Sequence, residues 1–416
     1  MTGGASPGTR AGTLLTRVRA ALLRPELQGY RGLAWLAIVL TVSLVLPAIL
    51  ILAVPIQSPI QPLVYAPGFL LAVVVSVTLG AHAGRWTLVA VLLLGLAVRA
   101  AGAGVQYSDV GMVTSAAIER AMDGLNPYGV GYHVSTPPGA PFPYGPLALA
   151  WYLPFRSDPR LVEYLVAAGI LFALAFRGRP IGFIVYALSP IFIYTTVDGS
   201  NDTSVGLLIL IALVGMRRSV ILGGAALAIA VSFKLYAAAW VPAFALWAGP
   251  AGLLVLAVGS VALWTPALLA WGIVPIADSL RLAQIIHEGV SGATGQMLEK
   301  LTGIPMDQEG WDRLRLILGG LTGVVTLRWV RSSQSVIVVG AVTYCVTLYA
   351  GYWTSVSYLA ALAPVVCWYL DEWTLASPRR VVWEPRDPFG RLVDWLDARW
   401  PVNDEPRAWR RPVPAT

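Results

Sequence analysis

The sequence predicts an all-α, polytopic membrane protein, a bundle of about twelve transmembrane helices whose extracytoplasmic loops carry interfacial helices. Three observations predict this class. Hydrophobic residues make up 57% of the chain and charged residues 12%, whereas soluble domains carry about 25% charged residues. The mean hydropathy is +0.69. Apolar runs recur along nearly the whole of the 416 residues, so one helical bundle is expected rather than several soluble domains.

The charge balance and the cysteines exclude several classes of protein. The net charge of +7 comes largely from arginines at the two ends and in short loops. In a membrane protein this distribution indicates topology and contact with anionic membrane lipids, and not nucleic-acid binding. Cys345 and Cys367 lie in apolar runs and support neither a disulfide framework nor a metal site. The first apolar run lacks a small-residue cleavage site, so no cleavable signal peptide is expected.

Three segments are expected. Residues 1–30 form a basic cytoplasmic segment, residues 31–370 the transmembrane domain, and residues 371–416 an Arg/Trp-rich cytoplasmic tail. The predicted protein is therefore a multi-pass plasma-membrane protein with both termini in the cytoplasm. An apolar stripe at helical spacing in the tail predicts a helix on the inner leaflet, with docking of a partner as the alternative. The stripe consists of Phe389, Leu392, Val393, Leu396 and Trp400.

The first part of the chain predicts three crossings followed by a long polar loop. The crossings are expected at residues 33–54, 63–80 and 86–103. Because the N-terminus is placed in the cytoplasm, the third crossing ends outside, and the polar stretch 106–146 is extracytoplasmic. Arg99 in the third crossing predicts either a functional role or a buried ion pair. Long polar loops between membrane helices usually carry function.

Local signals divide this loop into a helix and an extended segment. Asp109 can cap a helix over residues 110–122, which has one apolar stripe and is expected to lie along the membrane surface. The proline-rich residues 137–143 must be extended. Pro146 can open the next helix at its first turn.

The later apolar runs predict the remaining crossings. Residues 147–155 are too few to cross, so they are taken as a partly inserted helix and residues 161–176 as the crossing, because arginines follow the second run. A second outer loop is expected at residues 272–312, with an interfacial helix, and an aromatic hinge at residues 349–358. The further crossings are expected at residues 181–196, 203–216, 220–232, 238–248, 251–271, 314–327, 335–352 and 356–370.

On this topology the polar residues gather on the outer side, where they suit transfer of a sugar from a lipid phosphate. A carboxylate must deprotonate the attacking hydroxyl, and Asp109 is the candidate base; the alternative is a plain helix cap. Cations must neutralise the departing phosphate. Lys234 is the first candidate, since lysine is costly near lipid, with snorkelling to the interface as the alternative. Arg281 and His287 are further phosphate contacts, although His287 could equally be solvated.

Asp198, Asn201 and Asp202 form a second acidic turn on the same side. We expect them to shape the sugar and acceptor pocket through hydrogen bonds. Binding of a divalent metal by Asp198 and Asp202 is the alternative, since hard cations prefer oxygen ligands, and simple turn residues are a third interpretation. No cofactor is firmly predicted. The chain has no phosphate-binding glycine loop and no dinucleotide motif, which disfavours a nucleotide-sugar donor held in a soluble domain.

An ordered set of motifs resembles polyprenyl-phosphate-mannose-dependent mannosyltransferases of the GT-C superfamily, near glycosyltransferase family 87. The resemblance covers residues 106–242 best and the rest only by hydropathy. Two departures are visible: two extra spans are expected before the outer-face Asp, where one is common, and the acidic turn lacks a Gln. The motifs are Asp109, Gly124-Leu125-Asn126-Pro127-Tyr128, Pro143-Tyr144-Gly145-Pro146-Leu147, Ser189-Pro190, Gly199-Ser200-Asn201-Asp202 and Lys234.

This resemblance implies a GT-C fold and an inverting transfer with Asp109 as base. The partners are then a polyprenyl-phosphate sugar donor, with mannose the expected sugar, a cell-envelope glycolipid or glycan acceptor, and membrane lipids. Asn126, Tyr128 and Tyr144 are expected in the sugar and acceptor pocket, where aromatic rings can stack on a sugar. The rival hypothesis is a multispan transporter or lipid flippase, which would place charged sites near the bilayer midplane in repeated halves.

Overall fold

The structure, a computed structural model, describes residues 83–102, 108–285, 293–374 and 380–403, and it is mostly helical, as predicted. The fifteen α-helices of this part of the chain are α4 (Arg85–Ala101), α5 (Asp109–Met122), α6 (Pro146–Tyr152), α7 (Arg160–Arg177), α8 (Pro180–Leu188), α9 (Pro190–Val197), α10 (Asp202–Met216), α11 (Val220–Phe233), α12 (Val241–Trp271), α13 (Ile273–Ile285), α14 (Thr294–Thr302), α15 (Gln308–Thr326), α16 (Ser333–Tyr349), α17 (Ala363–Thr374) and α18 (Pro388–Arg399).

Short elements connect these helices. Four 3₁₀ helices are η3 (Leu153–Phe155), η4 (Leu235–Trp240), η5 (Leu327–Trp329) and η6 (Val356–Leu362). The strands β1 (Gly131–Tyr132) and β2 (Ala140–Pro141) pair antiparallel, a small departure from the all-α prediction. The extended segment predicted at residues 137–143 contains β2, and Pro146 opens α6 as expected.

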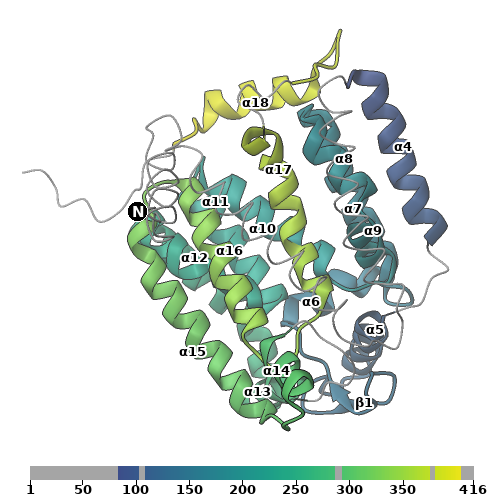
Figure 1. The fold of residues 1–416 in the computed structure, drawn as a ribbon, viewed down its shortest axis with the longest axis vertical. Coiled ribbons are helices and arrows are strands. Elements are labelled where there is room, and N and C mark those ends of the chain that lie inside the picture. Colours follow the sequence, from purple (N-terminus) through teal and green to yellow (C-terminus); the bar gives the residue numbers. More distant parts are fainter. Residues whose placement is uncertain (1–82, 103–107, 286–292, 375–379, 404–416) are drawn as a thin grey trace, which may run out of the picture.

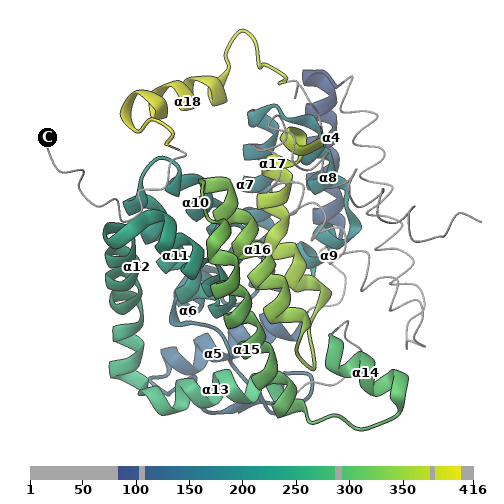
Figure 2. The same ribbon diagram turned by 60° about the vertical axis from the view of Figure 1, so that its left-hand side comes forward.

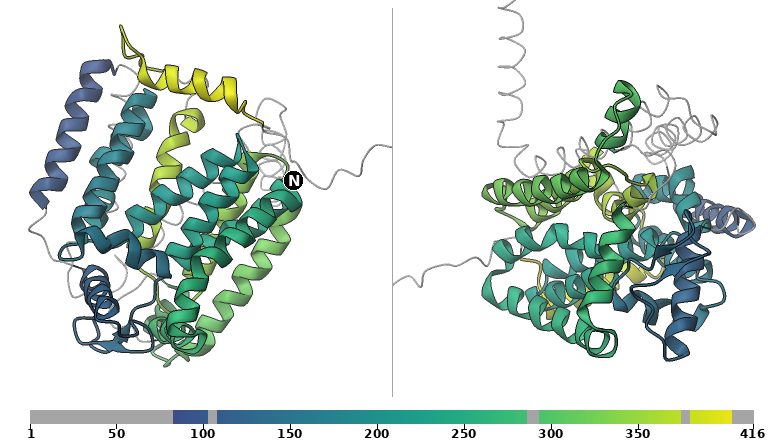
Figure 3. Two further views of the ribbon diagram at one scale, coloured as in Figure 1. Left: turned by 180° about the vertical axis from the view of Figure 1, so that it is seen from behind. Right: turned by 90° about the horizontal axis from the view of Figure 1, so that it is seen from below.

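The bundle has two distinct ends (Figure 1). α18 lies across one end, while α5, β1, α13 and α14 gather at the other, which we call the loop end. The view in Figure 2 and the view from behind in Figure 3 show the same separation. α10 is central: it packs against α7, α9, α11, α17 and η6, and its Val205 and Ile209 are fully buried. The described part of the predicted polar loop therefore lies at one end of the bundle.

The prediction of about twelve membrane crossings is wrong for the part of the chain that the structure describes. There, one helix, Leu235–Trp271, is long and apolar enough to cross, or up to three if each bent helix pair counts as one span. The pairs are Pro146–Phe155 with Arg160–Arg177, bent by 95°, and Pro180–Leu188 with Ile191–Val197, bent by 55°. The crossings expected at residues 33–54 and 63–80, and the basic segment 1–30, lie outside the described residues.

Proline and glycine explain where the helices break or bend. The run predicted as one crossing at residues 181–196 breaks into α8 and α9 at Ser189, which is extended because Pro190 follows it. The pair of crossings expected at 238–248 and 251–271 is one candidate span instead. It contains a kink at Gly249, whose φ of 70° suits glycine, followed by Pro250.

Two buried charges complete the ends of α8. Arg99 is 1% exposed and donates to the carbonyl oxygens of Tyr186 (2.8 Å) and Ala187 (3.0 Å), at the C-terminal end of the helix. Asp371 accepts from the backbone N–H groups of Ile181 (3.0 Å) and Gly182 (2.8 Å), at the N-terminal end. A cation at the C-terminus and an anion at the N-terminus both match the helix dipole. Arg99 thus completes a helix end through backbone carbonyl groups, rather than through the ion pair that the sequence suggested as one alternative.

The C-terminal segment bears out the predicted tail helix. α18 contains the predicted stripe except Trp400, which follows it as the C-cap residue; the helix begins after the cap Asp387, and all its residues are at least partly exposed. Arg218 pairs with Asp397 at 2.6 Å and attaches α18 to the bundle. The boundary predicted at residue 371 falls inside α17, which continues to Thr374.

Candidate functional site

The site is built where the polar loop meets the end of α11. Gly145 donates its N–H to the carbonyl oxygen of Phe233 at 3.1 Å. A Cβ at Gly145 would lie 2.0 Å from the carbonyl oxygen of Ser232, so only glycine allows the two backbones to approach this closely. This contact places Tyr144 beside Lys234, the residue at which α11 ends.

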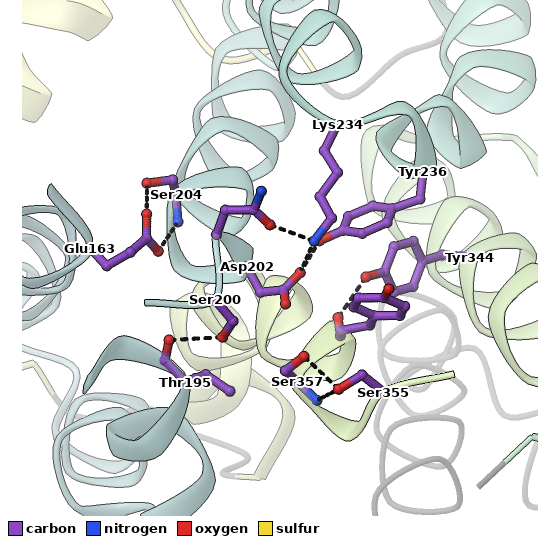
Figure 4. Close-up of polar contacts among 12 residues, drawn as sticks. Glu163, Thr195, Ser200, Asp202, Ser204, Lys234, Tyr236, Tyr344, Ser355 and Ser357 are labelled. Atoms are coloured by element: carbon purple, nitrogen blue, oxygen red, sulfur yellow. Dashed lines mark hydrogen bonds and ion pairs between the residues drawn. The ribbon is translucent and has the colours of Figure 1, made fainter. Parts of the chain in front are cut away.

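Lys234 is buried in a cluster of polar and aromatic side chains (Figure 4). Its Nζ donates to Asn201 Oδ1 at 2.6 Å and to Asp202 Oδ1 at 2.7 Å. Tyr236 also donates to Asp202 Oδ1. Three aromatic rings surround the ammonium, with Nζ 5.3, 4.5 and 4.8 Å from the ring centroids of Tyr144, Tyr236 and Tyr358. The lysine is therefore held by an ion pair and by cation–π contacts, and does not snorkel to an interface.

Asp109 lies at the first turn of α5 and does not cap it, so the alternative of a plain helix cap is wrong. Ser108 caps the helix, accepting the N–H of Val110 on its side chain at 3.2 Å, because its backbone is extended. Asp109 Oδ2 instead accepts the N–H of Thr136 at 3.0 Å, across the loop, and the residue is only partly buried. Its carboxylate is thus held in place without being sealed from solvent.

Asp198 lies next to the start of α5. The carbonyl oxygen of Asp198 accepts the N–H of Ser108 at 2.7 Å, and its Oδ1 accepts both the N–H and the hydroxyl of Ser200, each at 2.8 Å. Burial raises the pKa of Asp198 to about 7, and the nearby carboxylates of Asp202 and Asp109 add to this. Burial also raises the pKa of Tyr144, with Asp109 and Asp202 among the further causes. The three carboxylates and Tyr144 therefore act on one another electrostatically.

Two predicted pocket residues attach the loop to the bundle. Asn126 accepts the N–H of Tyr128 at 2.9 Å and donates to the carbonyl oxygen of Trp271 at 3.1 Å. Tyr128 is buried, lies 5.6 Å from Trp271 between ring centroids, and donates its hydroxyl to the carbonyl oxygen of Tyr144 at 3.1 Å. Their contacts hold Tyr144 in position, and neither is among the side chains that contact Lys234.

The two further phosphate candidates are not part of the cluster. Arg281 is exposed on α13, which lies where the helix of the predicted loop at 272–312 was expected. The described part of that loop also contains α14 and the start of α15. His287 lies outside the described residues. The metal alternative gains no support, because Asp202 accepts from Lys234 and Tyr236, and no group of three or more His, Cys, Asp or Glu side chains suited to a metal occurs in the described part of the chain.

Three side chains of this region were not among the site residues predicted from the sequence. Tyr236 and Tyr358 line the ammonium, and Glu163 of α7 contacts the start of α10 at Ser204. Glu163 had a signal in the sequence, since it is an ionisable residue beside an apolar run and fully buried ionisable residues are rare without a partner. Tyr236 had none, because aromatic residues are frequent in such segments, whereas Tyr358 lies in the predicted aromatic hinge at residues 349–358, which was not assigned to the site.

Comparison with known proteins adds no relative to these observations. A scan against protein-family models, a search of curated proteins and a search of solved structures each returned no match.

Proposed function

We propose that this chain is an integral-membrane glycosyltransferase of the GT-C type. It transfers a sugar, with mannose the first expectation, from a polyprenyl-phosphate donor to a cell-envelope glycolipid or glycan at the extracytoplasmic face. The observation that carries the proposal is the contact of the Asp109 loop with the end of α11. It brings a partly exposed carboxylate and a buried lysine within a ring of tyrosines to the same end of the bundle.

The proposed reaction is a single displacement. The acceptor hydroxyl loses its proton to the Asp109 carboxylate while its oxygen attacks the anomeric carbon. The bond from this carbon to the phosphate oxygen breaks, its electron pair stays on that oxygen, and the configuration inverts. Lys234 stabilises the negative charge on the leaving polyprenyl phosphate. Tyr144, Tyr236 and Tyr358 are suited to line the path of the sugar.

Asp109→Asn tests the base within this proposal. An amide oxygen can still accept the N–H of Thr136, so the loop should keep its structure, but an amide cannot take the proton. We expect the variant to bind the donor and to lose about 10²–10⁴-fold in turnover. Transfer of radiolabelled sugar from polyprenyl phosphate in proteoliposomes measures this. Ser108→Ala is the matched control, since it removes the cap of α5 and costs about 1 kcal/mol of stability without touching the carboxylate.

Two results would count against the proposal at different levels. A variant Asp109→Asn that keeps more than about a tenth of wild-type turnover exceeds what loss of a general base allows, and Asp109 is then not the base. If the wild-type protein forms no glycosylated product from any polyprenyl-phosphate donor, the proposal that it is a glycosyltransferase is wrong.

A transporter or lipid flippase is the second candidate, and one observation favours it. α11 ends just before Lys234, which forms a buried ion pair with Asp202, so an interrupted helix meets a buried charged pair, as in many transporters. The two functions differ in their product. A transporter moves the lipid-linked sugar across the bilayer unchanged, whereas a glycosyltransferase leaves free polyprenyl phosphate and a new glycosidic bond.

A further inference from the structure

The start of α10 lacks the cap that its own sequence offers. Asn201 is the N-cap residue, and an N-cap Asn normally accepts the N–H of the residue two or three positions later. Here its side chain makes no such bond: its backbone (φ −71°, ψ 16°) is not extended as in an ordinary N-cap, and its Oδ1 accepts the ammonium of Lys234 at 2.6 Å. Its Nδ2 is buried without a hydrogen-bond partner in the described part of the chain.

Glu163 of α7 supplies the capping acceptor that Asn201 does not supply. Its Oε2 accepts the N–H of Ser204, the third residue of α10, at 3.0 Å. Its Oε1 accepts the hydroxyls of Ser204 and of Tyr152, the latter at 2.6 Å. The side chain is fully buried, and a carboxylate at a helix N-terminus is favoured by the helix dipole. In Figure 4, Glu163 and Lys234 lie on opposite sides of the start of α10.

We propose that Glu163 is a positioning residue for the Lys234 cluster. Glu163 caps α10 from a neighbouring helix. The side chain of Asn201 can therefore bind Lys234 instead of capping α10. Without Glu163, the N–H of Ser204 would lack its acceptor, and Asn201 would supply one by turning to the extended backbone of an ordinary N-cap. This change would withdraw Oδ1 from Lys234, which would lose one of its two hydrogen-bond acceptors. The inference about Asn201 is independent of the reaction; only its consequence for donor use rests on the proposed function.

The chain offers a direct way to observe Lys234, because Lys234 and Lys300 are its only lysines. In protein labelled with ¹³C at the lysine ε-carbon, Lys300→Arg removes one signal and so assigns the other to Lys234. All variants are then made in the Lys300→Arg background. Asn201→Ala provides the reference shift for a Lys234 that has lost this acceptor.

Glu163→Leu is expected to move the Lys234 signal toward its position in Asn201→Ala. Glu163→Gln keeps an acceptor oxygen for the N–H of Ser204 and should leave the signal at its wild-type position. Asp371→Leu is the matched control, since Asp371 is also a fully buried carboxylate that caps a helix from a neighbouring one, but it caps α8. It should destabilise the protein and leave the Lys234 signal in place.

The transfer assay adds a second readout. Glu163→Leu should raise the donor KM about tenfold, the size of one hydrogen bond to a charged group, while Glu163→Gln should behave as wild type. If Glu163→Leu does not fold, Glu163→Asp decides, because it keeps the charge but withdraws the carboxylate by one methylene, and it should move the signal the same way by less. A Lys234 signal that stays at its wild-type position in the folded Glu163 variant, while Asn201→Ala moves it, overturns the inference whatever the reaction is.

Discussion

Lys234→Met is the perturbation that bears most on the site, and its effect has two parts. Lys234 and Asp202 form an ion pair of 2.7 Å, with side chains that are 7% and 1% exposed. Removing the ammonium leaves the Asp202 carboxylate buried, with Tyr236 as its remaining donor among the contacts described above. Breaking a buried pair from one side costs about 3–5 kcal/mol, mostly through the uncompensated charge. A loss of activity in this variant would therefore say nothing by itself about phosphate binding.

A second substitution separates the two parts. Lys234→Met combined with Asp202→Asn removes both charges, and replacing a whole buried pair is often close to neutral. The double variant should therefore recover most of the stability lost in Lys234→Met. Donor affinity should stay low in both variants, by about 1.5–3 kcal/mol, because the charge-assisted contact to phosphate is missing from each.

Both quantities can be measured on purified protein. Thermal unfolding followed by tryptophan fluorescence gives the double-mutant cycle, and the 16 tryptophans provide the signal. Binding of a polyprenyl-phosphate sugar is measured separately below the unfolding temperature. The reasoning fails if the double variant regains donor affinity together with stability, because Lys234 is then only half of a structural ion pair. If Lys234→Met unfolds at the wild-type temperature, the ion pair with Asp202 does not stabilise the fold and the first part of the prediction is wrong.

Two further predictions concern Asp198 and the topology. Burial raises the pKa of Asp198 from 3.8 to about 7, so the folded state favours its protonated form. Its stabilising contribution is thus complete below pH 4 and is lost as the pH rises toward 7, by on the order of 1 kcal/mol of unfolding free energy per pH unit. Asp198→Asn should make the unfolding free energy depend less steeply on pH over this range. An unchanged pH dependence in this variant contradicts the assignment. Cys345 and Cys367 are buried, so single cysteines at the exposed positions His133 and Arg386 can be labelled in intact cells. An impermeant maleimide should react with His133→Cys at once and with Arg386→Cys only after permeabilisation, and labelling of both from outside would overturn the topology.

The sequence by itself determined the helical class, the polar loop and the positions of several elements. Local signals were sufficient for α5, α6, α10, α11 and α18, because their ends coincide with Ser, Pro, Asn or Asp residues or with charges at the edge of an apolar run. From topology, the sequence also predicted that the Asp109 loop and Lys234 lie on one side of the membrane; in the structure the loop contacts the end of α11 through Gly145.

Only the tertiary structure decided which groups complete the ends of the broken helices, although Pro190 and Gly249-Pro250 mark the breaks locally. Hydropathy measures how favourably a run enters an apolar environment, but a run such as 181–196 is equally apolar whether it is one helix or two. The broken ends need partners for their N–H and C=O groups, since a bundle interior offers no water. Arg99, Glu163 and Asp371 supply them across 87, 41 and 190 residues of sequence. Because these contacts are long-range, no local sequence pattern predicts that a buried glutamate caps α10 or that Asn201 binds Lys234 instead.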